Sequence, residues 1–516
     1  MRTERGVAGS LAGCAAAAVA LGVSELVAIA TGPRTSPLVA VGAVVVDAAP
    51  RPVVEFAIRV FGTADRVALQ VGTIVLLAAA AAALGAAAAH WWPVAPVALV
   101  AFAALGASAA VTRPGAGAVA ALPTVAGALA AGLTYALLHR RFATPPRGPT
   151  CVATGQVHDV HLARSTRRRL LGVAATVVGV AAVAGLAGRY LSNVRGVSQA
   201  RGDVALPPPA DPAPPVPPGS DLGVPGLASY VTPNDDFYRV DTALVVPQVD
   251  PRQWRLRIHG RVRRPYTLTF QDLLERPMVE RWITLTCVSN PVGGPFIGNA
   301  RWLGVPVADL LAEAGPLPGA DQVVSRSVDG WTCGTPTSVL MDGRDALLAV
   351  AMNGEPLPPE HGFPVRMVVP GLYGYVSACK WISEIELSSF DDFDAYWVRR
   401  GWAAQAPVKT QSRIDVPRGR VRAGTVTVAG VAWAQHRGIA RVEVRIDDGD
   451  WQEATLADTV SADTWRQWSL RWEATPGRHR LTVRATDGDG VTQPEQPAPP
   501  VPDGATGWHT VEVEVT

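Results

Sequence analysis

The sequence predicts a multi-domain fold class: an N-terminal all-α transmembrane bundle, an α+β domain and a C-terminal immunoglobulin-like β-sandwich. Three observations lead to this prediction. Residues 6–139 hold few charged side chains, although charged residues make up 17% of the chain. Residues 230–402 mix strand-like and helix-like patterns, and after Val408 only the two-residue alternation of strands remains.

Apolar runs near the N-terminus are long enough to cross a bilayer, because about 20 helical residues span its hydrocarbon core. They cover residues 9–30, 67–89, 94–112 and 117–138, and a fifth span covers residues 167–190. Together the first four runs define a bundle within residues 1–145.

Residues 37–62 are apolar but interrupted, so we expect an interfacial or re-entrant helix there rather than a simple span. The interrupting residues are Asp47, Pro50, Pro52, Glu55 and Arg59. The ionisable members of this set leave transport through the bundle open as a weaker alternative.

Basic residues predict the orientation, since basic loops stay in the cytoplasm. Arg2 and Arg5 put the N-terminus inside, and four crossings return the chain inside at Arg140 and Arg141. Residues 146–166 are then a cytoplasmic loop, and the fifth crossing puts the remainder outside. We therefore expect a multi-pass protein of the cell membrane with an extracytoplasmic soluble part.

The fifth span begins with a pattern that resembles a twin-arginine export signal. A hydroxyl residue, arginines and a leucine pair precede an apolar run without acidic residues. The residues that would be recognised are Thr166, Arg167, Arg168, Leu170 and Leu171. The alternative is a plain basic flank before a helix, which needs no particular order of residues.

Three regions follow the fifth span. Residues 191–228 include the proline-rich stretch 206–221, which predicts an extended, semi-rigid spacer. Residues 229–404 form the predicted α+β domain. Residues 405–516 alternate in short strands separated by turn signals, which predicts the β-sandwich.

Composition excludes several classes of function. The formal net charge of +2 gives no basic surplus for nucleic-acid binding. The five cysteines are scattered without a CxxC spacing, so neither a disulfide framework nor a zinc site is expected. No GxGxxG, P-loop or HExxH motif points to a nucleotide or zinc enzyme. We also predict no haem, because His90 and His139 near the span ends do not form a well-placed pair.

The segment LTCVSNPVGGPFIGNARWLGVPVADLL, residues 285–311, places Cys287 at the end of a predicted strand and before a glycine-rich loop. A lone cysteine is usually a small buried hydrophobe, and this is the alternative to a metal-binding thiolate. A second segment, MNGEPLPPEHGFPVRMVVPG at residues 352–371, is followed by SACKW at 377–381.

Together these segments resemble the sulfite oxidase family of molybdopterin enzymes, over roughly residues 230–516. The resemblance implies a sulfite-oxidase-like molybdopterin domain and a sandwich of the family's dimerisation type, so a homodimer is open. It implies molybdenum bound by Cys287 together with molybdopterin. It also explains an internal export signal, since such a protein would fold around its cofactor before crossing the membrane.

The resemblance assigns further residues to the site. Charged side chains suited to the pterin and its phosphate are His361, Arg366 and Lys380, with Ser377 and Cys379 nearby. Asn234 and Tyr238 match the first segment of the family's domain and are assigned to the cofactor. Arg301 and Trp302 join Cys287 as expected catalytic-pocket residues.

The chain also departs from the sulfite-oxidising pattern. Pro291 and Val292 stand where that branch has two arginines, and Val350 stands where it has a tyrosine. Arginine suits a small oxyanion, so its absence weakens sulfite as the substrate.

The sequence thus predicts a membrane-anchored molybdenum oxidoreductase that transfers an oxygen atom and two electrons, with sulfite or a related small sulfur compound as substrate. Electrons would pass to a separate carrier or a redox partner in the membrane. A sulfoxide or N-oxide reductase of the same fold stays open. So does a membrane-anchored binding protein whose enzyme-like domain is not catalytic.

Overall fold

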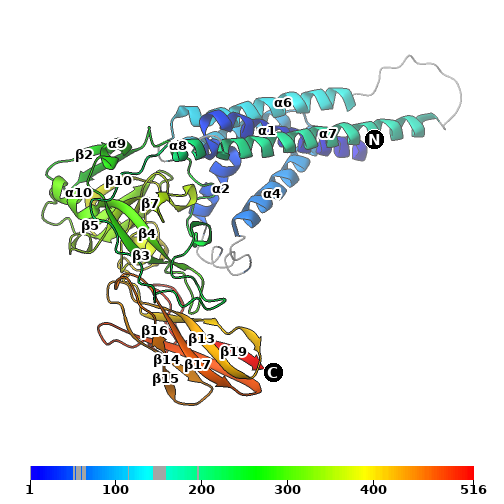
Figure 1. Ribbon diagram of the computed structural model, residues 1–516. Helices are drawn as coiled ribbons and strands as arrows, with labels where there is room; N and C mark the ends of the chain where they lie inside the picture. Colours follow the sequence, from blue (N-terminus) through cyan, green and yellow to red (C-terminus); the bar gives the residue numbers. More distant parts are fainter. Residues whose placement is uncertain are drawn as a thin grey trace. The chain divides into compact units, whose positions relative to one another are not determined.

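The computed structural model describes residues 2–49, 53, 60, 65–113, 116–142, 158–194 and 197–516. The chain divides into two compact units (Figure 1). Unit 1 comprises Met1–Ser198 and Ala243–Gln248, and unit 2 comprises Gln199–Thr242 and Val249–Thr516.

Unit 1 is helical, and its long first helix packs against three others (Figure 1). Its α-helices are α1 (Arg2–Thr31), α2 (Pro37–Ala48), α4 (Asp65–Ala88), α5 (Val94–Val111), α6 (Leu122–Phe142) and α7 (His158–Val194). Two 3-10 turns, η1 (Pro33–Thr35) and η3 (Ala118–Ala121), precede α2 and α6. Five of the helices, all except α2, are long and apolar enough to cross a membrane by length and composition. They coincide with the five predicted apolar runs.

Small residues let these helices approach closely. A side chain at Gly9 would collide with the backbone of α4, and one at Gly22 with the carbonyl of Ala181 in α7. One at Gly127 in α6 would collide with Ser24 of α1. Such contacts are typical of helices that associate through backbone proximity.

The interrupted segment begins with α2, whose first residue, Pro37, suits a helix start because its missing N–H is not needed there. Near the end of α2, Asp47 pairs with Arg113 at 2.8 Å. Pro50, Pro52, Glu55 and Arg59 lie outside the described residues.

The export-like pattern lies within a helix. Residues 158–166, which we expected to be part of a loop, belong to α7, and so do the backbones of Thr166, Arg167, Arg168 and Leu170. Leu171 begins the apolar stretch Leu171–Gly188. Of the expected loop, residues 146–157 lie outside the described residues.

Unit 2 contains four sheets. The strands of its α+β part are β1 (Arg255–Gly260), β2 (Tyr266–Thr269), β3 (Val279–Thr286), β4 (Ile297–Pro306), β5 (Gln322–Ser327), β6 (Thr332–Pro336), β7 (Leu347–Met352), β8 (Glu355–Pro356), β9 (Arg366–Val368) and β10 (Ile382–Ser388). One sheet has the order β2-β1-β10-β5-β6, and the other the order β3-β4-β7-β8 with β9 also on β7. Short helices connect them: α8 (Ser198–Gly202), η4 (Asn234–Asp236), α9 (Phe270–Leu274), α10 (Val307–Ala314), α11 (Thr337–Leu340), η5 (Pro359–His361), η6 (Gly374–Val376) and η7 (Val398–Arg400).

The C-terminal part is a sandwich of two sheets, with the orders β11-β13-β17-β16 and β12-β19-β18-β14-β15. Its strands are β11 (Gln411–Val416), β12 (Gly419–Val421), β13 (Gly424–Trp433), β14 (Ile439–Ile446), β15 (Trp451–Glu453), β16 (Thr455–Leu456), β17 (Arg466–Ala474), β18 (Gly477–Asp487) and β19 (His509–Val515). The predicted alternation is confirmed in β14, where the inward residues Val442 and Val444 are fully buried and the preceding Arg441 is exposed.

Strand-like sequence at residues 254–262, 280–288 and 381–388 corresponds to β1, β3 and β10, and the helix-like sequence at 307–315 corresponds to α10. The stretch from Ala300 to Val305, directly before α10, lies in β4. Its residues are almost all buried, as in a central strand packed on both faces.

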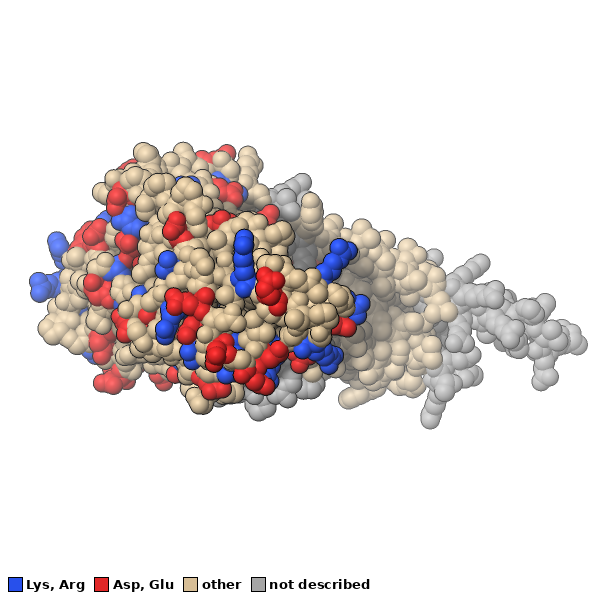
Figure 2. Space-filling model, turned by 60° about the horizontal axis from the view of Figure 1, so that its bottom comes forward, with Lys and Arg blue, Asp and Glu red and all other residues tan. Residues whose placement is uncertain are grey.

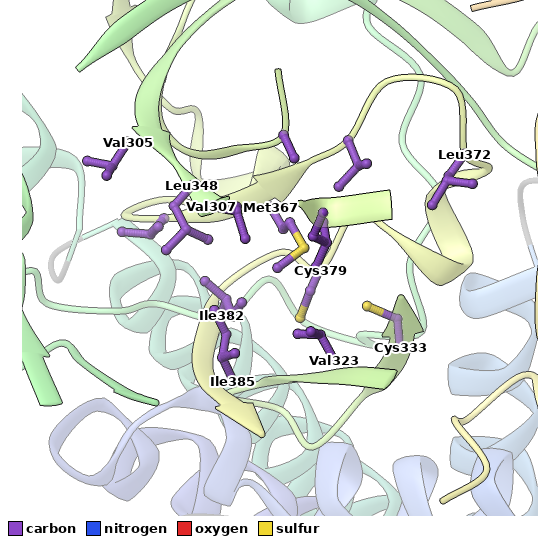
Figure 3. Packing of buried hydrophobic residues seen from close by; sticks show 14 of the residues in the cluster. Val305, Val307, Val323, Cys333, Leu348, Met367, Leu372, Cys379, Ile382 and Ile385 are labelled. Atoms are coloured by element: carbon purple, nitrogen blue, oxygen red, sulfur yellow. The ribbon is translucent and has the colours of Figure 1, made fainter. Parts of the chain in front are cut away.

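The core of the α+β part is apolar and includes two buried thiols. Figure 3 shows Cys333 on β6 and Cys379 after η6 with their sulfur atoms on the same side of Val323. Met367, Ile382 and other aliphatic residues surround them. Burial and the neighbouring Cys333 thiol raise the pKa of Cys379 well above its ordinary value, so the Cys379 thiol stays protonated.

The proline-rich segment is extended, but the expectation of a free spacer is wrong. Residues 203–230, here called the strap, are bound along their length to the rest of unit 2. Ala210 donates to the Met278 carbonyl at 2.7 Å, and the Trp282 indole donates to the Pro214 carbonyl at 3.0 Å. Because prolines leave their carbonyl groups free, a proline-rich strand can still accept hydrogen bonds from a neighbouring surface.

Further along, the strap joins the α+β part to the sandwich. The backbone N–H of Leu222 donates to the Gln467 side chain at 2.7 Å. The hydroxyl of Tyr230 donates to Thr464 at 3.0 Å and accepts from the Val460 N–H at 3.1 Å.

The two units differ in how many charged side chains they expose in the view of Figure 2. Red and blue side chains are intermixed over unit 2, whereas the part of unit 1 visible in this view is nearly free of both.

Candidate molybdenum and molybdopterin site

Cys287 stands directly after β3, at the mouth of a closed loop. Its N–H donates to the Phe296 carbonyl at 3.0 Å, which joins the two ends of the glycine-rich loop. Asn290 closes the loop further, because its N–H donates to the Cys287 carbonyl at 3.1 Å and its Oδ1 accepts from the Phe296 N–H at 2.9 Å. The loop therefore fixes the position of the thiol.

The Cys287 side chain is half-buried, and its Sγ lies 2.9 Å from Ser289 Oγ. Burial raises the pKa of this thiol, while Ser289 and the charge of Lys380 oppose the change. Without a metal the group is a thiol at neutral pH, and a bound metal ion would displace its proton.

Three basic residues, here called the basic cluster, converge near this loop: His361 from η5, Arg366 from β9 and Lys380 after η6. Gly362 brings them together, since it adopts a left-handed φ of 111° and a Cβ there would lie 3.0 Å from Arg366 and 3.2 Å from Lys380. Arg366 Nη1 donates to the His361 carbonyl at 3.2 Å. His361 Nε2 lies 3.0 Å from the Asn234 carbonyl oxygen.

The basic cluster carries more positive than negative charge. Lys380 pairs with Asp241 at 2.7 Å, and this carboxylate also pairs with Arg239 at 2.8 Å. Arg366 is 5% exposed and has only carbonyl oxygens as hydrogen-bond partners among the described residues. A buried guanidinium without a carboxylate is costly unless an anion binds it.

Burial shifts the pKa values of all three residues of the basic cluster. Burial lowers the pKa of Arg366 to about 10 and that of Lys380 to about 8, although Asp241 opposes the latter. Burial and the charge of Arg366 lower the pKa of His361 to about 4, so this ring is neutral at pH 7. A dianionic phosphate, which accepts charge-assisted hydrogen bonds from arginine and lysine, fits this donor set.

An aromatic wall supports the basic cluster. The Arg366 guanidinium lies over the Trp302 ring at 5.1 Å. Phe237 meets Trp302 edge-on at 5.8 Å and His361 at 5.6 Å between ring centroids. The Trp302 indole donates to the Ile283 carbonyl at 3.1 Å, and the side chain is fully buried. The buried Trp302 ring therefore packs against the Arg366 guanidinium.

Arg301 is not near the thiol. It pairs across the sheet with Trp282, five residues before Cys287, which corresponds to about 16 Å along a strand. Its guanidinium contacts Glu280 at 3.2 Å. Because Arg301 and Trp302 are adjacent in β4, their side chains point to opposite faces, so the two cannot enter one pocket.

Asn234 fastens the segment before Tyr238 to the turn between β7 and β8. Its Nδ2 donates to Glu355 at 2.5 Å, and its Oδ1 accepts from Asn353 Nδ2 at 2.9 Å. Because the Asn234 carbonyl also contacts the His361 ring, Asn234 helps to orient this member of the basic cluster.

Ser377 and Cys379 face the interior. Ser377 Oγ donates to the Tyr373 carbonyl at 3.0 Å, and Cys379 belongs to the thiol pair in the core. Their turn nevertheless sets the place of Lys380, because the Cys379 carbonyl accepts from the Met367 N–H at 2.9 Å.

Sequence reasoning missed four residues of this arrangement: Phe237, Asp241, Ser289 and Asn353. Asn353 carried a usable signal, since Asn-Gly marks a tight turn, and its φ of 53° is left-handed. Asp241 carried none, because only the fold brings it to Lys380.

Comparison with known proteins identifies two family domains in the chain. Residues 243–397 match the family model of the oxidoreductase molybdopterin binding domain, and residues 403–516 match that of the Mo-co oxidoreductase dimerisation domain.

Individual relatives point the same way. The chain is 32% identical to mitochondrial sulfite oxidase of Mus musculus over 55% of its own length and 62% of the relative's. It is 32% identical to sulfite oxidase of Gallus gallus over 52% of its own length and 69% of that protein's. The mouse protein is thus matched over less than two thirds of its length.

Among solved structures, sulfane dehydrogenase SoxCD from Paracoccus pantotrophus is similar with 25% identity and a TM-score of 0.49. That alignment covers 57% of this chain and 86% of the other. From the matched domains and relatives, the chain belongs to the sulfite oxidase family of molybdenum oxidoreductases.

Proposed function

We propose that this protein is a membrane-anchored molybdenum oxidoreductase that acts on a small substrate outside the cytoplasm. The observation that carries the proposal is the buried Arg366, which has no carboxylate partner among the described residues and lies in a basic cluster near the Cys287 loop. A binding module without a cofactor would leave this charge uncompensated.

The residues divide into two roles. Arg366, Lys380 and neutral His361 would hold the phosphate and pterin of molybdopterin, with Asn234 and Asp241 orienting them. Cys287 would bind molybdenum. When bound, this cofactor supplies oxygen-atom transfer coupled to two electrons.

Sulfite or a related small sulfur compound is the proposed substrate, supported by the sulfite oxidases among the relatives. Reduction of a sulfoxide or N-oxide is the second candidate. It is favoured by Pro291 and Val292, which offer no cation in the thiol loop, and by Val350, which is 1% exposed within the core.

The apolar helices support a multi-pass anchor, and the basic flanks support an extracytoplasmic unit 2. Export by the twin-arginine route would suit a domain that folds around its cofactor first. Electrons would leave through a separate carrier or a membrane partner, and the dimerisation-type sandwich supports a homodimer.

The test is the molybdenum and pterin content of the full-length protein, purified from a molybdopterin-producing host, beside Cys287→Ser. Near-stoichiometric metal and pterin in the wild type, with pterin kept but metal lost in the variant, would support the proposal. A wild type that contains neither would leave the non-catalytic binding protein as the better account.

A further inference from the structure

Tyr238 has a hydroxyl group that makes no hydrogen bond with any described residue, although the side chain is half-buried. Tyrosine hydroxyls in such places usually find a partner. Its ring stacks on Phe237 at 5.3 Å between centroids, so the packing fixes the ring and leaves the hydroxyl free.

Contacts of Phe237 place the ring on which Tyr238 stacks near the end of β3. A Cβ at Gly298 would strike the Phe237 ring, and Gly298 pairs across the sheet with Leu285, two residues before Cys287. Phe237 also contacts Trp302, the residue on which Arg366 lies.

Electrostatic interactions agree with this placement. Burial raises the pKa of Tyr238, a negative charge at Cys287 raises it further, and the Arg366 guanidinium lowers it. Both groups therefore act on the phenol, in agreement with the packing of Phe237 against Gly298 and Trp302.

We propose that the Tyr238 hydroxyl is a catalytic residue that donates a hydrogen bond to an oxygen atom of the small substrate beside Cys287. The inference rests on the proposed function. It changes the role of Tyr238 from holding the cofactor to contacting the substrate.

This role is consistent with the rest of the thiol site. Val350 is in the core, and Pro291 and Val292 supply no donor side chain, so the positions that carry a tyrosine and two arginines in the sulfite-oxidising pattern offer no donor to a substrate oxygen here. A neutral phenol can donate a hydrogen bond to a sulfoxide, N-oxide or sulfite oxygen, and this oxygen need not carry a full negative charge.

The test compares Tyr238→Phe with wild type and with the control Tyr266→Phe. Tyr266 lies on β2, and in the wild type its hydroxyl donates to the Leu310 carbonyl of α10. Each full-length protein is assayed for molybdenum, for pterin, and for turnover of sulfite with ferricyanide and of dimethyl sulfoxide with reduced viologen. Calorimetry measures binding of sulfate and of dimethyl sulfoxide to the loaded proteins.

In Tyr238→Phe we expect unchanged metal and pterin, kcat/KM lower by about 100-fold, and weaker binding of one probe by about tenfold. Tyr266→Phe should match wild type in all four measurements. Unchanged turnover and binding in Tyr238→Phe would overturn the inference, and so would loss of pterin, which would return Tyr238 to cofactor binding. If the loaded wild type turns over neither substrate, the proposed function fails, whereas calorimetry still decides the role of Tyr238.

Discussion

Replacement of Arg366 by methionine should stabilise the cofactor-free protein, although it removes a buried side chain. Burial lowers the pKa of Arg366 from 12.5 to about 10. At about 1.4 kcal/mol per pKa unit, keeping this group charged at pH 7 costs the folded state about 3 kcal/mol. Methionine removes that cost, while the two carbonyl oxygens that lose a donor offset about 1 kcal/mol each. The net expectation is a gain of about 1 kcal/mol.

Arg413→Met provides the matched control. Arg413 is also buried, but it pairs with the buried Asp415 at 2.7 Å and donates to the Gly294 carbonyl at 2.9 Å. The same substitution there removes the buried cation from Asp415, which keeps only the more distant Arg418 at 3.7 Å, and should cost about 3 to 5 kcal/mol. Thermal unfolding of the full-length apoprotein, followed by tryptophan fluorescence, should show Arg366→Met melting roughly 2 to 4 °C higher and Arg413→Met roughly 9 to 15 °C lower.

In a molybdopterin-producing host, Arg366→Met should retain about 10- to 100-fold less pterin, since a charge-assisted contact to phosphate is lost. If Arg366→Met melts as low as Arg413→Met, Arg366 is a structural cation and the reasoning from its missing carboxylate is refuted.

Three further expectations concern stability of the apoprotein. The pKa of His361 is about 4 in the folded state and 6.5 ordinarily, so the unfolded state binds one more proton between these pH values. The free energy of unfolding should therefore fall by up to about 3 kcal/mol from pH 6.5 to 4. An equally steep fall in His361→Gln would contradict this. Asp241→Asn leaves Lys380 without its carboxylate and should cost about 3 to 5 kcal/mol by denaturant unfolding, whereas the exposed-pair control Asp250→Asn should stay within about 0.5 kcal/mol; equal effects would disprove the role of burial. Tyr230→Phe should cost about 1 to 2 kcal/mol and expose the strap to protease earlier, and an unchanged cleavage rate would mean that the strap is held elsewhere.

Much of the fold could be predicted from local sequence patterns. Alternation identified the sandwich strands, and apolar length identified the long helices, because both depend on neighbouring residues. The strap could not be predicted in this way. Its prolines correctly excluded a helix, but whether an extended chain is free or bound depends on distant partners such as Met278 and Gln467.

The site divides in a similar manner. The motifs led to Cys287, Arg366, Lys380 and His361, and the fold brings the last three together around Gly362. The motif also does not show that Arg301 and Trp302, as successive residues of β4, face opposite sides of the sheet. Asp241, fixed by tertiary contact alone, could not be found from the sequence.

The unequal burial of the thiols gives this protein an intrinsic chemical reporter. Among residues 197–516, Cys333 and Cys379 are fully buried and Cys287 is only half-buried. In a variant with Cys14 and Cys151 replaced by serine, a maleimide that cannot cross membranes should therefore modify native protein at one position. Labelling of intact cells would then depend on two things at once: which side of the membrane Cys287 faces and whether a metal already occupies its sulfur.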